Sequence, residues 1–364
     1  MRAMPSTWIT AALTLASAGV VLSAQAPAPA ADPNRRLLAL GDFPLESGAV
    51  LKNAKVAYAT FGTYDPAANN AVLVPSYYGA DYHGYDFLVG PGKALDPAKY
   101  FVVLTEMFGN GFSSSPSNTP APQSGPDFPA IAIRDNVEAS RRVLESLGVT
   151  HLRAVVGFSM GAEQAFQWAV SHPGFMDGIV PWCGTAKSYP HGVVRLQSAI
   201  DALTADPAFN NGHYASPPPA GMRAWASHWA SWVWSQEWWR RELFKPAQQT
   251  VAEVIATRYQ RDIVRDPNNL ILHARTWQAH NVGDTRGFGG DVEKALASIT
   301  ARVLYMPSES DMYFPITDAR YEQPFLKRST FMPIPTLWGH AAGGGGNPAD
   351  AAFINDAIRD FLAR

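Results

Sequence analysis

The stretch that decides the fold is Ala154-Val-Val-Gly-Phe-Ser-Met-Gly161, an apolar run that ends in a serine flanked by two glycines. Its valines favour a buried strand, whereas the spacing of apolar residues over Gly161–Ser171 is typical of a helix. Ser159 therefore stands at a sharp turn between strand and helix, where Gly157 and Gly161 leave room for the backbone. In this arrangement the helix N-terminus directs partial positive charge at a nucleophilic hydroxyl.

Outside this turn, short β-rich runs alternate with helical stretches. Strands are expected at Lys55–Gly62, Ala71–Ser76, Tyr100–Thr105, Leu152–Gly157, Met176–Trp182 and Ala301–Met306, and helices at Asp135–Leu147, Gly161–Ser171 and Pro348–Arg364. The alternation predicts an α/β fold, a mostly parallel sheet flanked by helices on both faces. It stops in a Trp-rich helical block, so we expect residues 32–188 and 296–364 to form the core and residues 189–295 a lid insertion.

A serine hydroxyl needs a base and an orienting acid, which follow the nucleophile along the chain in this kind of fold. Among the late histidines, His273 and His280 lie in the lid insertion, whereas His340 follows the last apolar run and precedes the closing helix. His340 is therefore the predicted base. Asp311 is the predicted acid because its short side chain lies further into the loop after Ala301–Met306 than that of Glu309.

Two alternatives for the acid remain to be considered. Asp318 is a third candidate. The loop after the strand Met176–Trp182 is another place where the acid could stand, but residues 180–184 contain no carboxylate.

Backbone donors and a substrate site are also expected around Ser159. The oxyanion hole is expected to use the backbone N–H groups of Met160 and Tyr78, with Tyr77 as the alternative to Tyr78. The residues expected to line the substrate site are Tyr77, Phe158, Trp229 and Trp232.

The tryptophans of the lid have a helical spacing. Trp225, Trp229 and Trp232 fall at i, i+4 and i+7, and Trp239 follows one heptad after Trp232. On one helix these rings would share a face, which predicts either a lid core or dimer contact, or a roof over the cleft that selects a bulky apolar group.

The N-terminus has the order of a secretory signal. Arg2 precedes an apolar run over residues 8–22, and Ala24-Gln-Ala26 offers small residues for cleavage. We expect residues 1–31 to comprise a signal peptide and an Ala-Pro linker, so that the mature protein is periplasmic or secreted and begins between Gln25 and Asp32. A retained membrane anchor or a disordered tail is the alternative.

The composition narrows the classes of partner. The net charge is −2 and no long run of Lys or Arg occurs, which argues against a nucleic-acid partner. Cys183 is the single cysteine, so no internal disulfide is expected, and we expect it to be a small buried residue. No spacing of Cys, His or acidic residues is typical of a metal site, and no cofactor is predicted.

With these motifs in place, the chain from about residue 38 to 362 resembles the homoserine O-acetyltransferase-like branch of the α/β hydrolases. Three stretches carry the resemblance: Gly90–Phe101, Gly157–Ala165 and Ser310–Pro315. The resemblance implies an α/β-hydrolase fold, a helical lid, and Ser159, Asp311 and His340 as the triad. The chain departs from the acetyltransferases at Phe158 and Ala162, where they usually have glycine, and at Ala341, where they tend to have an acidic residue.

Three classes of function are compatible with these features. The first is an exported serine hydrolase that cleaves a small-molecule carboxylic ester, or a lactone, thioester or amide, through an acyl-serine intermediate. The second is an O-acyltransferase, which would need acetyl-CoA, a cytoplasmic donor. The third is a binding protein with a vestigial site. Of the three we expect the hydrolase. The protein partner that we expect for it is a second copy of the same chain, bound through the lid.

Overall fold

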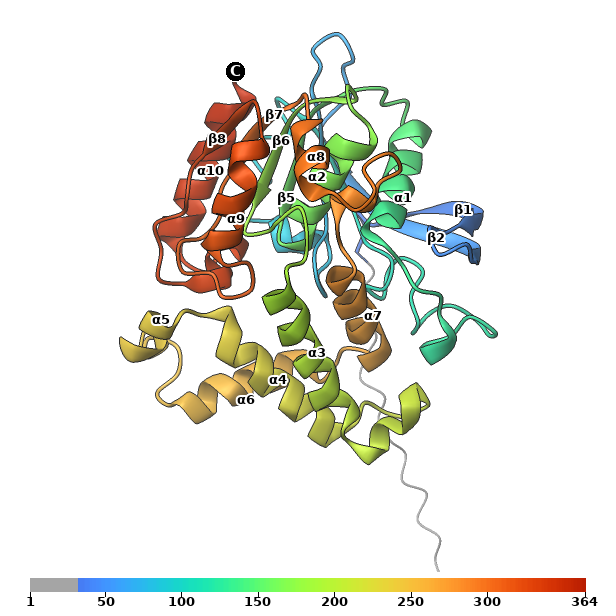
Figure 1. The fold of residues 1–364 in the computed structure, drawn as a ribbon, viewed down its shortest axis with the longest axis vertical. Coiled ribbons are helices and arrows are strands. Elements are labelled where there is room, and N and C mark those ends of the chain that lie inside the picture. The colour runs from blue at the N-terminus through green and yellow to red at the C-terminus, as the bar shows by residue number, and fades with distance from the viewer. Residues whose placement is uncertain (1–31) are drawn as a thin grey trace, which may run out of the picture. The chain divides into compact units, whose positions relative to one another are not determined.

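One mixed sheet runs through the protein, in the spatial order β1-β2-β4-β3-β5-β6-β7-β8 (Figure 1). The computed structural model describes residues 32–364, and the signal peptide predicted for residues 1–31 lies outside this range. The β1–β2 and β2–β4 pairs are antiparallel and all later pairs are parallel. The strands are β1 (Arg36–Pro44), β2 (Val50–Phe61), β3 (Ala71–Pro75), β4 (Phe101–Thr105), β5 (Leu152–Phe158), β6 (Met176–Trp182), β7 (Arg302–Tyr305) and β8 (Ser329–Phe331).

Helices cover both faces of the sheet because each central strand is apolar on both sides. Within β3, Leu73 points into one core, whereas Val72 and Val74 point into the other. The first core contains side chains from α1 and α2, and the second contains side chains from α10. This confirms the predicted α/β class. The helices of the core are α1 (Ile133–Ser146), α2 (Met160–Ser171), α9 (Ile316–Glu322) and α10 (Pro348–Leu362).

Between β6 and β7 the chain forms helices that gather on one side of the sheet (Figure 1). Pro190, Pro219 and Pro267 stand in the first turns of three of them, where a missing N–H does no harm. A capping box of Thr250 and Glu253 begins a fourth. We call α3–α7 the lid: α3 (Pro190–Thr204), α4 (Pro219–Val233), α5 (Gln236–Arg240), α6 (Val251–Asp262) and α7 (Pro267–Gln278), after which α8 (Val292–Ala297) leads into β7.

A buried carboxyl group joins the start of the lid to the core. Glu322, at the end of α9, accepts hydrogen bonds from the backbone N–H of Ala186 at 2.9 Å and from the hydroxyls of Tyr305 at 2.8 Å and Tyr189 at 3.1 Å. No cation pairs with it among the described residues. Burial raises the pKa of Glu322 to about 8. The acid is therefore neutral at neutral pH, and it connects α9 to the segment between β6 and α3.

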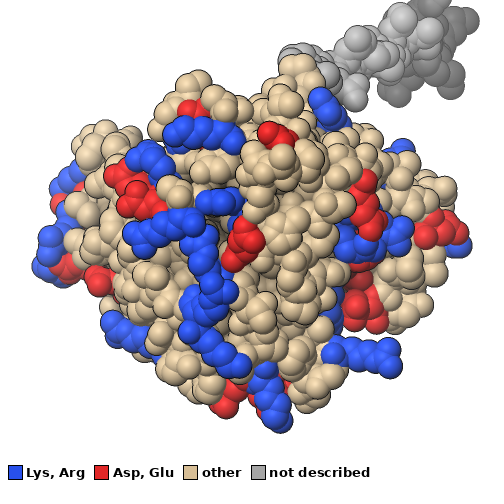
Figure 2. Space-filling view, turned by 90° about the horizontal axis from the view of Figure 1, so that it is seen from above, with Lys and Arg blue, Asp and Glu red and all other residues tan. Residues whose placement is uncertain are grey.

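Positive and negative side chains are mixed on the face of the protein that Figure 2 shows. Figure 2 shows a narrow track of Lys and Arg there, with Asp and Glu beside it and no broad basic surface. A shallow depression on the core is lined by Arg153, Arg302 and Arg328 together with Asp177, near the amino ends of β5, β6 and β7. Among residues 32–364 no helix combines the length and apolar character needed to cross a bilayer.

Two strands, β1 and β8, were not predicted from the sequence. β8 has only three residues, of which Ser329 and Thr330 are polar, so it carries no apolar signal. β1 is mostly exposed and its pairing with β2 shifts register around Gly41. Both lie at the edges of the sheet, where burial does not impose a clear pattern.

Candidate active site

The turn after β5 holds Ser159 in a strained backbone conformation. Its φ of 57° lies in the left-handed region, which non-glycine residues rarely adopt. A Cβ on Gly157 would lie 2.0 Å from the carbonyl oxygen of Gly161, and one on Gly161 would lie 2.7 Å from that of Pro75. Gly157 therefore allows the end of β5 to approach the first turn of α2, and Gly161 allows α2 to approach the end of β3. The side chain of Ser159 lies at the N-terminus of α2, as the sequence predicts.

His340 lies within hydrogen-bonding distance of both other predicted triad residues. Oγ of Ser159 is 3.0 Å from Nε2 of His340, and Nδ1 of His340 is 2.7 Å from Oδ2 of Asp311. The other carboxylate oxygen of Asp311 accepts the backbone N–H groups of Tyr313 at 2.7 Å and Phe314 at 3.2 Å. These two bonds orient the carboxylate, which in turn orients the imidazole.

Aromatic rings hold the imidazole of His340 from several sides. The ring centroid of Phe158 lies 4.7 Å away in a stacked arrangement, and those of Tyr313 and Phe314 lie 4.5 and 5.6 Å away. A Cβ on Gly343 would lie 2.2 Å from the ring of Phe158, so the glycine run after His340 makes room for this ring. The rings limit the ways in which His340 can rotate away from Ser159.

The competing candidates lie elsewhere. Glu309 is exposed, and Asp318 lies on α9 with no hydrogen bond to a histidine among the described residues. His280 is buried in the lid, and burial lowers its pKa to about 3. Cys183 is fully buried, and burial raises the pKa of its thiol, which makes it a poor nucleophile.

His273 is not placed to act as a base for Ser159, because backbone groups occupy both of its ring nitrogens. Its Nδ1 accepts the backbone N–H of Gly79 at 3.0 Å, and its Nε2 lies 2.9 Å from the carbonyl oxygen of Phe108, to which it donates. Burial lowers the pKa of His273 to about 4, so the ring is neutral at physiological pH. Since His273 lies on α7 and Gly79 follows Tyr78, the lid directly holds the loop predicted to form the oxyanion hole.

The backbone N–H groups of Tyr78 and Met160 have no acceptor among the described residues. Met160 is the first residue of α2, whose first N–H groups lack partners within the helix. The phenol of Tyr78 donates to the carbonyl oxygen of Leu270 on α7 at 2.7 Å, which fixes the loop from a second point. The ring of Tyr77 packs against Phe158 at 4.7 Å, and burial raises the pKa of Tyr77 to about 12. The assignment of the oxyanion hole remains a prediction.

A cavity of about 330 Å³ opens beside Ser159 and His340. Three of the residues predicted for the substrate site line it, namely Tyr77, Phe158 and Trp229, and so does Tyr78 of the predicted oxyanion hole. Trp232, the fourth residue predicted for the substrate site, does not line this cavity. Its ring packs against His191 in an open depression that Asp311 also lines.

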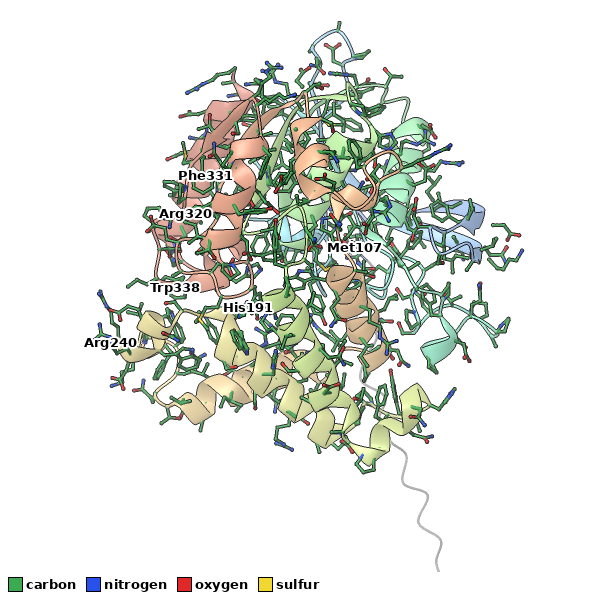
Figure 3. The ribbon with its side chains drawn as sticks, in the orientation of Figure 1. Met107, His191, Arg240, Arg320, Phe331 and Trp338 are labelled. Carbon is green, nitrogen blue, oxygen red and sulfur yellow. The ribbon has the colours of Figure 1, made fainter. Side chains whose placement is uncertain are left out.

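The predicted tryptophan stripe is also interrupted. Trp225 and Trp229 are 1% and 2% exposed on α4, but that helix ends at Val233 and Trp239 belongs to α5. Trp239 packs instead against Trp238 at 5.0 Å, and Trp238 contacts Trp338 of the core at 5.8 Å. Figure 3 shows Trp338 where the core meets α5. A continuous stripe needs one continuous helix, and the chain turns at Trp234–Ser235.

Sequence analysis missed three arginines of the cavity wall: Arg258, Arg261 and Arg265. Their spacing of i, i+3 and i+7 was a usable signal, because it places them on one side of the α6 region. The three are separated by other residues and form no charge run, so composition alone does not indicate a basic site. No Asp or Glu lines this cavity within the described part of the chain.

Comparison with known proteins agrees with this geometry. The model of the α/β hydrolase fold family matches residues 72–332. The chain is 36% identical over 312 residues to an ethyl acetate hydrolase of Pseudomonas veronii, covering 84% of this chain and 88% of that protein. It is 32% identical over 356 residues to a homoserine O-acetyltransferase of Symbiobacterium thermophilum, covering 87% and 91%.

A solved structure of an acetylester hydrolase from Corynebacterium glutamicum superimposes with a TM-score of 0.87. It is 33% identical in sequence, and the match covers 91% of this chain and 96% of that chain. The superposition therefore covers almost the whole described chain. The protein belongs to the α/β hydrolase fold family, in the branch that contains homoserine O-acetyltransferases and their esterase relatives.

Proposed function

We propose that the protein hydrolyses carboxylic esters with a short acyl group through an acyl-serine intermediate. The observation that carries the proposal is the hydrogen-bonded chain from Ser159 through His340 to Asp311 beside a cavity. The relatives that act on ethyl acetate and acetyl esters support it, because they match the chain over most of its length.

In this mechanism Oγ of Ser159 attacks the ester carbonyl carbon while Nε2 of His340 takes the hydroxyl proton. The negative charge that develops on the carbonyl oxygen is stabilised by the N–H groups of Met160 and Tyr78. His340 then donates its proton to the departing alkoxide, and the acyl group remains on Ser159. A water molecule, deprotonated by His340, attacks the acyl-serine, and the carboxylic acid leaves as Ser159 regains its proton.

The test is covalent labelling combined with turnover of a neutral acetyl ester. A fluorophosphonate should label the wild-type protein, and Ser159→Ala should abolish labelling and lower kcat/KM by about 10³-fold or more. Ser231→Ala is the matched control, because Ser231 is exposed on the outer side of α4. Labelling that persists in Ser159→Ala would contradict the assignment of the nucleophile.

Acyl transfer is the second candidate, favoured by the match to the acetyltransferase of Symbiobacterium thermophilum. It would use the same acyl-serine, with an alcohol in place of water. The ring of Phe158 argues for hydrolysis, since it stacks on His340 at a position where the acetyltransferases usually have glycine. If the protein acetylates homoserine from acetyl-CoA faster than it hydrolyses esters under matched conditions, it is a transferase.

We also propose that the enzyme works after export, on the strength of the signal-like order of the first residues. Mass spectrometry of the protein from the periplasm or medium of an exporting bacterium should give a first residue between Gln25 and Asp32. Intact Met1 in a membrane fraction would indicate an anchor instead.

A further inference from the structure

One wall of the cavity beside Ser159 is basic. Arg258 and Arg261 of α6 and Arg265 of the turn after it line the same cavity as Ser159 and His340. A catalytic cavity for a small neutral ester has no need of three guanidinium groups. Neutral ligands are usually bound by apolar walls and a few polar groups.

Among residues 32–364, one carboxylate forms ion pairs with the three arginines. Asp262, which is 2% exposed in its side chain, lies 2.8 Å from Nε of Arg258, 3.2 Å from Nε of Arg261 and 4.0 Å from Nε of Arg265. Burial opposes ionisation of Asp262, but the three guanidinium groups outweigh it and lower the pKa of this carboxyl. The cluster therefore carries two more positive than negative charges.

The geometry of these ion pairs leaves the terminal nitrogens of the three guanidinium groups available to a ligand. Each contact to Asp262 is made through Nε. None of the terminal Nη atoms of Arg258, Arg261 or Arg265 donates a hydrogen bond to an acceptor among the described residues. Paired Nη donors in one plane match the two oxygens of a carboxylate.

The basic wall lies close to the reacting centre. Nη1 of Arg265 would be 2.2 Å from a Cβ on Gly79, the residue after Tyr78, so this guanidinium touches the predicted oxyanion loop. Behind the aromatic part of the cavity, Arg195 lies 4.3 Å from the ring centroid of Tyr313 and 5.2 Å from that of Trp229. It is 2% exposed, and none of its three guanidinium nitrogens has a hydrogen-bond partner among the described residues, so its charge adds positive potential to the cavity.

We propose that the preferred substrate is an ester that also carries an anionic group, a carboxylate in the first instance, which Arg261 and Arg265 bind while the ester carbonyl reaches Ser159. The inference rests on the proposed esterase activity and names the substrate class of the same site. Arg258 is the most buried of the three, at 13% side-chain exposure, and mainly neutralises Asp262. Arg261 and Arg265, at 54% and 31%, are the more accessible donors.

The test compares two acetyl esters of the same shape, 3-acetoxybenzoate and 3-acetoxybenzamide. They differ in charge, since the amide replaces the carboxylate on the ring. We expect the wild-type enzyme to prefer the benzoate in kcat/KM by about 10- to 100-fold, as partly exposed charge-assisted hydrogen bonds allow. The preference should decrease as salt is raised from 0.05 to 0.5 M, because the groups remain partly accessible to ions.

The double variant Arg261→Gln plus Arg265→Gln should bring the ratio of the two kcat/KM values close to one. Arg258 stays in place, because its removal would leave the buried Asp262 short of a partner. Arg240→Gln is the matched control. Arg240 is 71% exposed, pairs with Glu237, and lies at the outer edge of the lid (Figure 3), so its replacement should leave the ratio unchanged. Thermal unfolding of each variant shows whether the lid remains folded.

The outcomes separate this inference from the proposed function. Equal or faster turnover of the benzamide by the wild type, or a preference that survives in the double variant, would overturn the inference and leave the esterase intact. If the wild-type protein is not labelled by the fluorophosphonate and hydrolyses neither ester, the proposed esterase function and this inference are both contradicted. Calorimetry with Ser159→Ala gives a second measurement without turnover: it should bind 3-acetoxybenzoate more tightly than 3-acetoxybenzamide, and equal affinities would count against the anion site.

Discussion

Replacement of Asp311 by asparagine tests whether this carboxylate sets the tautomer of His340. Oδ1 of Asp311 accepts the N–H groups of Tyr313 and Phe314 at 2.7 and 3.2 Å, while Oδ2 lies 2.7 Å from Nδ1 of His340. In Asp311→Asn the amide oxygen must take the place of Oδ1, because an NH2 group there would face two donors. The NH2 group is then directed at Nδ1 of His340.

Nδ1 must consequently accept a hydrogen bond, and the single proton of the neutral ring moves to Nε2. Nε2 lies 3.0 Å from Oγ of Ser159 and, once protonated, cannot take the hydroxyl proton. We expect kcat/KM for a neutral acetyl ester to fall about 10⁴-fold, as for the same exchange in other serine triads, which corresponds to about 5 kcal/mol of transition-state stabilisation. The fold should be retained, since both backbone N–H groups keep their acceptor.

The assay is ester hydrolysis at constant pH, monitored through the acid that the reaction releases. Thermal unfolding is measured on the same samples. Glu309→Gln is the matched control from the same loop, because Glu309 is exposed and its replacement should leave kcat/KM within about 2-fold. Activity of Asp311→Asn within 10-fold of wild type, at an unchanged melting temperature, would refute the tautomer argument. A larger loss in Glu309→Gln than in Asp311→Asn would show that the acid is misassigned.

Three other predictions concern the lid and the buried carboxyl group of Glu322 beside it. His273→Leu removes the acceptor of the Gly79 N–H and should lower kcat by on the order of 10-fold with a smaller change in KM, whereas His273→Gln, whose amide oxygen can replace Nδ1, should recover part of the rate. Trp229→Ala opens the cavity wall and should lower kcat/KM for bulky esters about 5- to 150-fold more than for acetyl esters; an equal loss on both, with a lower melting temperature, would assign Trp229 to the lid core alone. Glu322, whose folded pKa is raised to about 8, stabilises the fold fully below the unfolded pKa of a glutamate and loses this contribution as the pH rises to about 8, so about 1 kcal/mol should still disappear between pH 7 and 10. Glu322→Gln should flatten this decline in urea titrations, and a decline identical to that of the wild type would contradict the buried neutral acid.

The chemistry that depends on local chain geometry was predictable from the sequence. The strand, turn and helix around Ser159 follow from the apolar run, the two flanking glycines and the helical pattern after them. The central strands were predictable because they are buried on both faces and therefore uninterrupted in their apolar residues. His340 and Asp311 could be selected by their order along the chain and by the loops they occupy, without knowledge of any distance.

Contacts between segments far apart in the chain were decided only by the tertiary structure. Trp229 and Trp232 have equivalent signals in the sequence, but only Trp229 lines the cavity, because the rotation of α4 against α3 and α7 determines which face is turned inward. The hydrogen bond between Gly79 and His273 spans 194 residues, and no local pattern foretells it. The basic wall has the same origin: the helical spacing of Arg258, Arg261 and Arg265 lies in the sequence, but their position opposite Ser159 depends on how the lid packs on the core. Local sequence determines which side chains share a face, whereas packing determines what that face meets.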